Sequence, residues 1–423
     1  MEHRLCIVGL GYVGLALAKA TSEKGIPTIG VDSNSDVVSN LNGNIAKHNV
    51  ISSIDLEMMK KNGFVAFDSI PNNSCNVYLI CVPTPLTEEG KAEVKYIIDA
   101  TTSISKVLKK DDLIVLESTT YPGTTEEVVL PILELSGMKA GVDFFLAFSP
   151  ERVDPGNLMH SIANTPKIVS GYSKNCTERA INFYVEFVDT LKIAKGLKEA
   201  ELAKLIENSY RLVNISFVNE LAQYAEALEI DVWDSIDCAS SKPFGFQAFW
   251  PSAGAGGHCI PVDPMYLSGI VQERLGVEFR MIQTAKDING DMPNYISMRV
   301  HNMLSIAQLK YQPRVLVLGV SYKPNSSDVR DSPAIQVIES LSTLGYSVDY
   351  FDPHVPTFKL GSLFGSALDS ILNPEAQIEN YDAVIILQAH EQIMSSGWLL
   401  SAKRILDATG SLRTIDSDSI ELL

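Results

Sequence analysis

The sequence lacks any apolar run close to the roughly 20 residues that a membrane-spanning helix needs. It is also poor in basic residues: 34 lysines and arginines face 51 aspartates and glutamates, which gives a formal net charge of −17. This sign disfavours binding to nucleic acid polymers and to anionic membrane surfaces. Residues Met1–Arg4 lead straight into a short apolar run instead of a signal-peptide core. We therefore expect a soluble, cytoplasmic protein that binds neither nucleic acid nor membrane.

Cysteine is scarce, with six residues in 423, and the sequence has no Cys-x-x-Cys pair and no histidine at zinc-binding spacing. We predict no metal site and reduced thiols. Five of the cysteines are interpreted as small core residues: Cys6, Cys75, Cys81, Cys176 and Cys238. Cys259 stands in a different setting, described below.

The order of short apolar runs and helical stretches predicts an α/β protein with parallel sheets buried on both faces. From Leu197 to Ile230 the sequence has no glycine or proline, which predicts one helix of about 50 Å. A second α/β pattern begins at Val315. We predict two doubly wound Rossmann-like domains, 1–195 and 312–423, joined by this central helix and a helical middle domain, 196–311. Strands are expected at Leu5–Gly9, Thr28–Asp32, Val77–Val82, Leu113–Glu117, Phe144–Phe148, Lys167–Ser170, Val315–Gly319, Ser347–Asp352, Ala383–Leu387 and Ile405–Asp407.

A glycine-rich turn, Gly9-Leu10-Gly11-Tyr12-Val13-Gly14, links the first predicted strand to a helix, and Asp32 ends the second strand. Glycines at this spacing let the backbone approach a pyrophosphate at the positive helix end. An acidic residue after the second strand accepts hydrogen bonds from ribose hydroxyls and repels a 2′-phosphate, which favours NAD over NADP. The alternative is a glycine-rich turn that binds no nucleotide.

Two further segments follow strands of the same predicted sheet, where ligands bind in open α/β folds. One carries Pro83 and Thr84, and the other carries Ser118 and Thr119. Their alternative role is that of ordinary turns whose hydroxyls satisfy local backbone groups. Glu151 follows a later strand, which places another carboxylate at the same edge.

Cys259 lies in the run Gly254-Ala255-Gly256-Gly257-His258-Cys259-Ile260-Pro261-Val262-Asp263-Pro264. Glycines before a cysteine let backbone amides approach a reacting atom, and His258 and Asp263 put ionisable groups near the thiol. This loop setting favours a reactive thiol over a core thiol. On the long helix, Lys204, Asn208, Arg211 and Ile215 share one face, which is either a solvated face or the lining of a cleft.

Taken together, these residues resemble the UDP-glucose/GDP-mannose family of nucleotide-sugar 6-dehydrogenases. The resemblance covers nearly the whole chain and follows the family's order. Its motifs are the turn at 9–14, Cys-Val-Pro-Thr-Pro at 81–85, Glu-Ser-Thr at 117–119, Ser-Pro-Glu-Arg at 149–152, Ala-Glu-Leu-Ala-Lys-Leu-Ile-Glu-Asn at 200–208, Gly-Gly-His-Cys at 256–259, Val-Ser-Tyr-Lys-Pro-Asn at 320–325 and Asp-Val-Arg-Asp at 328–331.

The resemblance implies Cys259 as the nucleophile and a homodimer built around the central helix. It implies that Lys204, Asn208, Asp263, Glu151 and Thr119 complete the catalytic set. The implied NAD contacts are Gly9, Gly11, Tyr12, Val13, Gly14, Asp32, Pro83, Thr84, Ser118, Thr119 and Arg330. The implied contacts of the UDP-sugar are Glu151, Arg152, Val153, Lys204, Asn208, Arg211, Phe249, Gly256 and Lys323.

The chain departs from the UDP-glucose branch, which has serine before the nucleophile and a second glutamate, at His258 and Pro155. His258 before the cysteine, Ser-Pro-Glu-Arg at 149–152 and Lys242–Phe246 resemble the branch that oxidises UDP-N-acetylhexosamines. Within this branch the chain looks closer to UDP-N-acetylglucosamine 6-dehydrogenases. UDP-N-acetylmannosamine and UDP-glucose are alternative substrates. Two rivals remain: a two-electron hydroxyacid or sugar-phosphate dehydrogenase, and a non-catalytic NAD- or nucleotide-sugar-binding regulator.

Overall fold

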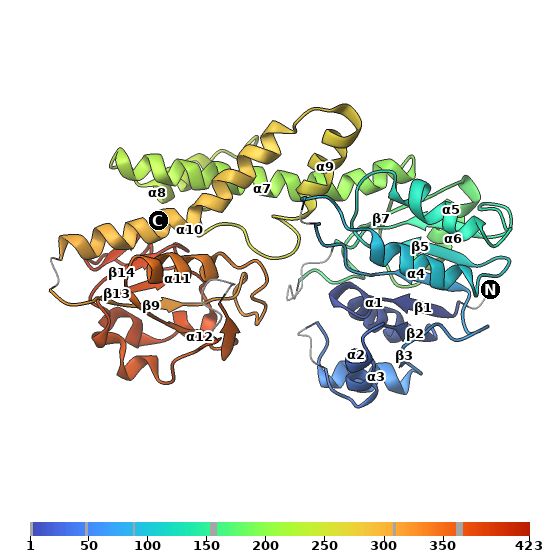
Figure 1. The fold of residues 1–423 in the computed structure, drawn as a ribbon, viewed down its shortest axis with the longest axis horizontal. Coiled ribbons are helices and arrows are strands. Elements are labelled where there is room, and N and C mark those ends of the chain that lie inside the picture. The colour runs from blue at the N-terminus through green and yellow to red at the C-terminus, as the bar shows by residue number, and fades with distance from the viewer. Residues whose placement is uncertain (1–2, 47–49, 88, 153–158, 308–309, 361–366) are drawn as a thin grey trace. The chain divides into compact units, whose positions relative to one another are not determined.

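The structure, a computed structural model, describes residues 3–46, 50–87, 89–152, 159–307, 310–360 and 367–423. The chain forms two compact units, each described by itself (Figure 1). The first comprises Met1–Glu207 with Met265–Val277, and the second comprises Asn208–Pro264 with Glu278–Leu423. The division into three domains at 195/196 and 311/312 stays a prediction. Among the described residues no helix is long and apolar enough to cross a membrane.

The first unit is built on a sheet of eight strands in the order β3-β2-β1-β4-β5-β6-β7-β8. Both faces of this sheet are buried, since Leu5 and Ile7 belong to one apolar cluster while Cys6 and Val8 belong to another. The strands are β1 (Leu5–Val8), β2 (Thr28–Val31), β3 (Val65–Phe67), β4 (Val77–Ile80), β5 (Leu113–Leu116), β6 (Phe145–Phe148), β7 (Lys167–Gly171) and β8 (Leu191–Ile193).

Helices cover the two faces of this sheet (Figure 1). Residues of α1 (Tyr12–Glu23) and α6 (Lys174–Tyr184) share the cluster of Leu5, and residues of α4 (Lys95–Ser105) share that of Cys6. The remaining helices of the unit are α2 (Ser35–Asn42), α3 (Ser53–Lys61), the π-helix η1 (Thr125–Val129), α5 (Leu130–Glu134) and part of α9 (Asp263–Leu275).

One strand pairing contradicts the expected parallel sheet: β7 pairs antiparallel to β6, with Phe148 opposite Ser170, and β8 runs parallel to β7. A parallel pair needs a crossover, usually a helix, and the described residues between these strands contain none. The reversal places Lys167, the first residue of β7, at the edge where β5 and β6 end. The expected strands all form, within two residues at each end, whereas the three-residue strands β3 and β8 were not predicted.

The long helix is confirmed as α7 (Leu197–Ala227), 31 residues that pass from the first unit into the second. The helices α8 (Val232–Ser240) and α10 (Arg280–Ile306) follow it in the second unit. Of the five cysteines assigned to the core, four are buried, but Cys238 on α8 is exposed. That prediction was wrong for Cys238 because α8 buries Val232, Trp233 and Ile236 and turns the cysteine outward.

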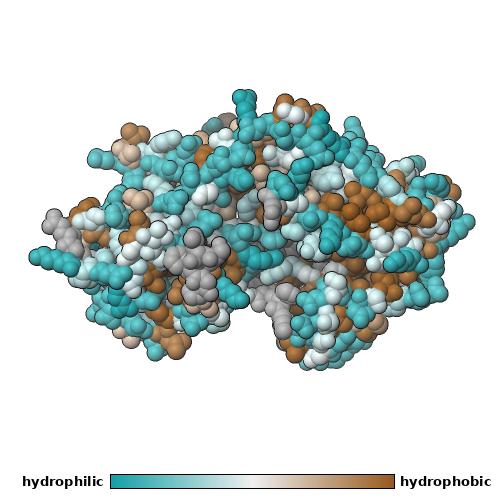
Figure 2. All heavy atoms as spheres, in the orientation of Figure 1, coloured by the Kyte–Doolittle hydropathy of each residue, from teal (hydrophilic) through white to brown (hydrophobic). Residues whose placement is uncertain are grey.

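The second unit contains the predicted parallel sheet, in the order β10-β9-β13-β14-β15. Alternate residues of the interior strand β9 again face two clusters, Val315 and Val317 on one side and Leu316 and Leu318 on the other. The elements are β9 (Arg314–Leu318), α11 (Pro333–Thr343), β10 (Ser347–Phe351), β11 (Thr357–Lys359), β12 (Ala367–Asp369), η2 (Pro374–Ala376), η3 (Ile378–Asn380), β13 (Ala383–Ile386), α12 (Glu391–Met394), η4 (Gly397–Ser401), β14 (Ile405–Asp407) and β15 (Ile420–Leu422). On the face drawn in Figure 2, hydrophilic residues cover most of the surface, with hydrophobic patches between them.

Candidate active site

The glycine-rich turn after β1 has the geometry that a bound dinucleotide requires. Gly9 has a φ of +97°, and a Cβ there would lie 2.6 Å from the carbonyl oxygen of Cys81. A Cβ on Gly14 would lie 1.9 Å from the carbonyl oxygen of Gly9. A Cβ on Gly11, which caps α1, would meet nothing within 4 Å. The turn is therefore tight where it touches the protein and open at the helix end, where a pyrophosphate fits.

Asp32 is fixed beside this turn by two backbone amides. Its Oδ2 accepts a hydrogen bond from the amide of Leu10 at 2.9 Å, and its Oδ1 accepts one from Asn34 at 2.9 Å. The residue is half-buried, and Tyr12 and Val13 on the first turn of α1 are also half-buried. A carboxylate oxygen accepts more than one hydrogen bond, so Asp32 retains capacity for ribose hydroxyls.

The segments after β4 and β5 contact each other. The Thr84 hydroxyl donates to the carbonyl of Thr119 at 2.8 Å, and the Ser118 hydroxyl contacts the carbonyl of Val82 at 2.7 Å. Ser118 is buried, so its hydroxyl supports the turn, while Thr119 and Pro83 remain partly exposed. Tyr266 of α9 donates to the carbonyl of Thr84, a contact that no sequence pattern indicated.

A buried charge cluster lies at the same sheet edge and was not predicted. The ammonium of Lys167 is 2.7 Å from Glu117 Oε2, 3.3 Å from the carbonyl oxygen of Pro150 and 3.9 Å from Glu151 Oε2. The hydroxyl of Tyr184 donates to Glu117. A lysine and a glutamate bordering apolar strands were the only sequence signal, and it did not reveal their pairing.

Burial dominates the electrostatics of this cluster. Burial raises the pKa of Glu117 to about 7, because desolvation disfavours the charged carboxylate and the Lys167 ammonium only partly offsets it. Burial also opposes the charge of Lys167, but Glu117 and Glu151 outweigh it and raise the pKa of the lysine. Lys167 thus stays cationic and connects the buried Glu117 to the candidate base Glu151.

Arg152, the residue after Glu151, is held by contacts within the first unit. Arg152 donates its backbone amide to Glu151 Oε1 at 2.7 Å, and its guanidinium pairs with Glu207 at 2.5 Å. The arginine predicted to touch the UDP-sugar is therefore already paired with a carboxylate of α7. Val153 lies outside the described residues.

The polar residues of α7 divide by burial. Asn208 is buried and donates its amide to Asp263 Oδ2 at 2.6 Å, so two candidate catalytic residues are in contact. Lys204, one helical turn earlier, is half-buried, whereas Arg211 is exposed. Phe249 is partly buried, and its ring packs edge-on against Tyr210 with centroids 5.8 Å apart.

The cysteine loop is anchored at both of its ends. Asn289 of α10 accepts from the amide of Ala255 at 2.5 Å and donates to its carbonyl at 3.1 Å. After the cysteine, the amide of Asp263 donates to the carbonyl of Cys259 at 2.9 Å. Cys259 itself is exposed. The nucleophile candidate therefore sits on a rigid turn that also holds Asp263.

The same loop packs on residues that follow β9. A Cβ on Gly256 would lie 2.7 Å from the carbonyl oxygen of Asp331, and one on Gly257 would lie 2.8 Å from the ring of Tyr322. His258 pairs with Asp331 at 3.4 Å. These glycines are thus required by close packing, and the Cys259 loop rests on the segment that carries Lys323 and Arg330.

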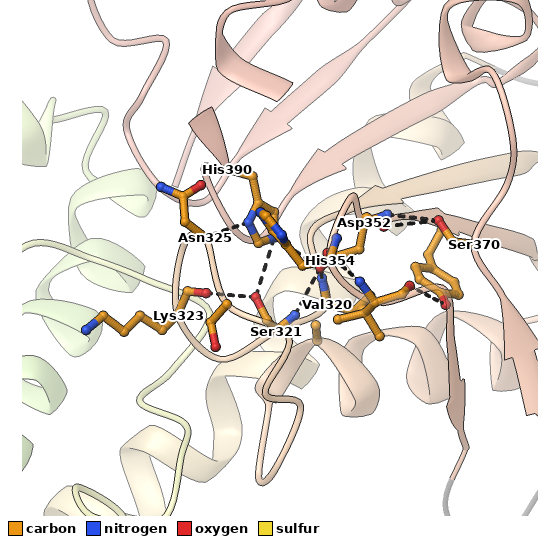
Figure 3. A network of polar contacts seen from close by, with 12 residues as sticks. Val320, Ser321, Lys323, Asn325, Asp352, His354, Ser370 and His390 are labelled. Atoms are coloured by element: carbon orange, nitrogen blue, oxygen red, sulfur yellow. Dashed lines mark hydrogen bonds and ion pairs between the residues drawn. The ribbon is translucent and has the colours of Figure 1, made fainter. Parts of the chain in front are cut away.

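The segment after β9 carries the last two predicted ligand contacts, Lys323 and Arg330. Arg330 pairs with Asp328, its Nη2 lying 2.6 Å from Oδ2. Lys323 is half-buried and lies beside a polar network in which the buried side chains of Ser321, Asp352 and His390 meet the backbone amide of the exposed Asn325 (Figure 3). Among the described residues, no group of three or more histidines, cysteines, aspartates or glutamates could hold a metal ion.

Three family models match consecutive parts of the chain. Residues 3–188 match the NAD-binding domain of the UDP-glucose/GDP-mannose dehydrogenase family, 198–291 match its central domain and 316–414 match its UDP-binding domain. The three matches together cover most of the sequence.

Similar proteins carry related names. A UDP-N-acetyl-D-glucosamine 6-dehydrogenase of Pseudomonas aeruginosa is 33% identical, with 94% of this chain and 92% of the relative aligned. A UDP-N-acetyl-D-mannosamine dehydrogenase of Pyrococcus horikoshii is 31% identical, with coverages of 93% and 91%. The structure of a UDP-D-ManNAc dehydrogenase from Pyrococcus horikoshii has a TM-score of 0.88 at 29% identity and covers 99% of this chain and 98% of its own.

Proposed function

The chain belongs to the UDP-glucose/GDP-mannose dehydrogenase family and is an NAD-dependent UDP-sugar 6-dehydrogenase, and we propose that it oxidises UDP-N-acetylglucosamine. The proposed reaction converts the C6 alcohol to a carboxylate and consumes two NAD+ and one water. The observation that carries it is the exposed Cys259 on a turn that also fixes Asp263 against Asn208. We propose that the uronic acid serves polysaccharide or glycoconjugate synthesis.

The residues of the site divide the reaction between them. NAD bound at the turn after β1 would supply the hydride acceptor for the sugar C6, and Lys204 or a water held by Asp263 takes the proton of the C6 hydroxyl. The Cys259 thiolate then captures the aldehyde as a thiohemiacetal, and a second hydride transfer leaves a thioester. Water attacks this thioester with Glu151 as base, assisted by Thr119. Capture on Cys259 keeps the aldehyde in the site between the two oxidations.

Stabilisation of the developing oxyanion is assigned to Lys204 and Asn208. A preorganised donor contributes roughly 3 to 4 kcal/mol to a transition state of this kind. An amide carries two N–H donors, and the contact to Asp263 orients the Asn208 amide while engaging one of them. The buried Asp263 therefore serves both as an orienting acceptor and as a water-holding group.

The substrate is tested by the NADH yield per sugar with UDP-N-acetylglucosamine, UDP-N-acetylmannosamine and UDP-glucose. We expect the highest kcat/KM with UDP-N-acetylglucosamine and two NADH per molecule. The proposal rests on His258 and the Ser-Pro-Glu-Arg segment, while relatives named for both N-acetylated epimers match at similar identity. A higher kcat/KM with UDP-N-acetylmannosamine or UDP-glucose would make that sugar the substrate. Binding of the sugars without NADH formation would favour a non-catalytic nucleotide-sugar-binding regulator.

The cofactor preference is tested at Asp32. We expect Asp32→Ala to relax the preference for NAD over NADP by about tenfold or more, because one unfavourable charge and one ribose acceptor are removed. The ratio of kcat/KM values for the two cofactors measures this. Asp36→Ala, an exposed carboxylate on α2 with the same charge change, is the matched control. Unchanged discrimination in the Asp32 variant would remove Asp32 from the ribose site.

We also propose a homodimer through α7. Four large residues on one stripe of this helix, Tyr210, Phe217, Leu221 and Tyr224, each keep more than a third of their surface exposed. Their spacing of seven, four and three residues is that of a helix–helix seam. A second copy of α7 would cover them by twofold symmetry, and the mass in solution checks this.

We assign the protein to the cytoplasm on the state of its cysteines. All six are free thiols, and free thiols are typical of reducing compartments.

A further inference from the structure

The turn after β9 repeats the dinucleotide turn after β1 in detail. Gly319 has a φ of +78° and donates its amide to the carbonyl of Phe351 at 2.9 Å. Gly9 has a φ of +97° and donates to the carbonyl of Val31 at 2.8 Å. In each case the glycine follows the first strand of its α/β domain and bonds to the end of the neighbouring parallel strand. The two units therefore share one local design.

The acidic residue is repeated too. Asp352 follows β10 as Asp32 follows β2, and its Oδ2 accepts from the amide of Val320 at 2.8 Å, as Asp32 Oδ2 accepts from Leu10. Its Oδ1 accepts from the amide of His354 at 2.8 Å. The two aspartates differ in burial: Asp32 is half-buried, whereas the side chain of Asp352 is fully buried and contacts His390 Nε2 at 3.0 Å. In the second unit, His390 therefore contacts the carboxylate group that would bind a ribose in a dinucleotide site.

His390 is held in one orientation by its two ring nitrogens. Nδ1 accepts a hydrogen bond from the backbone amide of Asn325 at 2.9 Å. A neutral imidazole that accepts at Nδ1 carries its proton on Nε2, so Nε2–H donates to Asp352. The ring is fully buried, and Figure 3 shows it between Asp352 and the Asn325 backbone. His390 therefore links the end of β10 to the turn that follows β9.

The link made by His390 holds the backbone on either side of Lys323. The Ser321 hydroxyl donates to the carbonyl of Lys323 at 2.8 Å, and Asn325, at a φ of +56°, is held by His390. Asn325 also accepts at Oδ1 from the amide of Glu391 at 3.0 Å. The Lys323 side chain extends away from this network in Figure 3. These hydrogen bonds thus hold the backbone from which the Lys323 side chain leaves the chain.

We propose that His390, supported by Asp352, is a positioning residue for nucleotide-sugar binding: it sets the Ser321–Asn325 turn so that Lys323 meets the UDP-sugar. The inference rests on the proposed role of Lys323 in binding that substrate. It explains why the second Rossmann-like domain keeps the glycine and the aspartate of a dinucleotide turn but buries the carboxylate. The retained aspartate orients a histidine in place of a ribose.

The test measures dissociation constants for UDP-N-acetylglucosamine without NAD, and for NAD alone, by calorimetry. In His390→Gln the side-chain amide can still donate to Asp352, but the acceptor for Asn325 is lost. We expect the dissociation constant of the UDP-sugar to rise about tenfold, since the part-buried backbone amide of Asn325 loses its hydrogen-bond acceptor. The constant for NAD should stay within about twofold, because the Gly9–Gly14 turn and Asp32 lie in the first unit and the predicted NAD contact Arg330 lies outside the Ser321–Asn325 turn. His390→Asn, which offers an acceptor near the Nδ1 position, should recover part of the loss. His354→Gln, an exposed neighbour, is the matched control.

A double-mutant cycle separates positioning from general structural support. In a Lys323→Ala background, His390→Gln should add little further loss of UDP-sugar affinity if it acts through Lys323. A full tenfold further loss there overturns the inference while leaving the role of Lys323 intact. If Lys323→Ala alone leaves the affinity unchanged, the proposed role of Lys323 is wrong and the inference falls with it. Equal losses for both ligands, or failure of both histidine variants to fold, would show a structural role only.

Discussion

Cys259→Ser is expected to abolish the four-electron oxidation. A hydroxyl is far less nucleophilic than a thiolate at neutral pH, so the aldehyde is not captured and the second hydride transfer has no covalent substrate. We expect the rate of uronic acid formation to fall by at least about a thousandfold, as for the loss of other enzyme nucleophiles. NADH and uronic acid per UDP-sugar consumed, in a coupled assay, measure this effect.

The matched control is Cys238→Ser. Cys238 is also an exposed cysteine, but it lies on α8 and not on the glycine-rich loop. This variant should keep the activity of the unmodified enzyme, which excludes a general effect of removing a surface thiol. Two NADH per sugar at a normal rate from Cys259→Ser would rule out covalent catalysis at this residue.

Lys167→Met is expected to have the largest effect on stability. It leaves the buried Glu117 without its cation, and breaking a buried ion pair in this way costs about 3–5 kcal/mol. The loss should depend on pH. Burial raises the pKa of Glu117 to about 7 in the unmodified protein, and loss of the Lys167 ammonium, which lowers it, raises the pKa further in the variant. Protonation of Glu117 therefore stabilises the variant below the unfolded pKa, and this stability is lost as the pH rises through the raised folded pKa. Denaturant unfolding near pH 5 and near pH 8 should therefore show the greater loss near pH 8.

The double variant Glu117→Gln/Lys167→Met tests the cause. It removes both charges while keeping an amide to accept from Tyr184, so it should unfold at higher denaturant concentration than Lys167→Met alone. Equal losses in the single and double variants, or a loss independent of pH, would assign the effect to packing of the lysine stem. A restored fold would also allow the influence of Lys167 on Glu151 to be measured without unfolding.

Local motifs made the dinucleotide turn predictable. Gly9 and Gly14 are required by contacts within a few residues or with the adjacent strand, and Asp32 directly follows β2, which pairs with β1. Such contacts depend on backbone geometry that a short motif specifies by itself. The long helix α7 was equally accessible, because the absence of glycine and proline over its length leaves a helix as the favoured conformation.

The charge cluster and the His390 link could not be predicted in this way. Glu117 and Lys167 are 50 residues apart, and they meet because β7 runs antiparallel to β6 and starts at the edge where β5 ends. His390 and Asn325 are 65 residues apart, and their hydrogen bond needs both the β9 turn and the residues after β13 in place. Burial of Asp352, in contrast to Asp32, follows from these neighbours and not from the similar local sequence.

The sequence by itself determined the alternation of strands and helices, the family and the residue types at each reacting position, because these are carried by local patterns and ordered motifs. The tertiary structure decided which of those residues are buried, paired or exposed. It joined Asn208 to Asp263, seated the Cys259 loop on Tyr322 and Asp331, and enclosed Lys167 between two carboxylates. Desolvation and hydrogen bonding between distant segments set these properties, and both depend on chain packing that no single segment specifies.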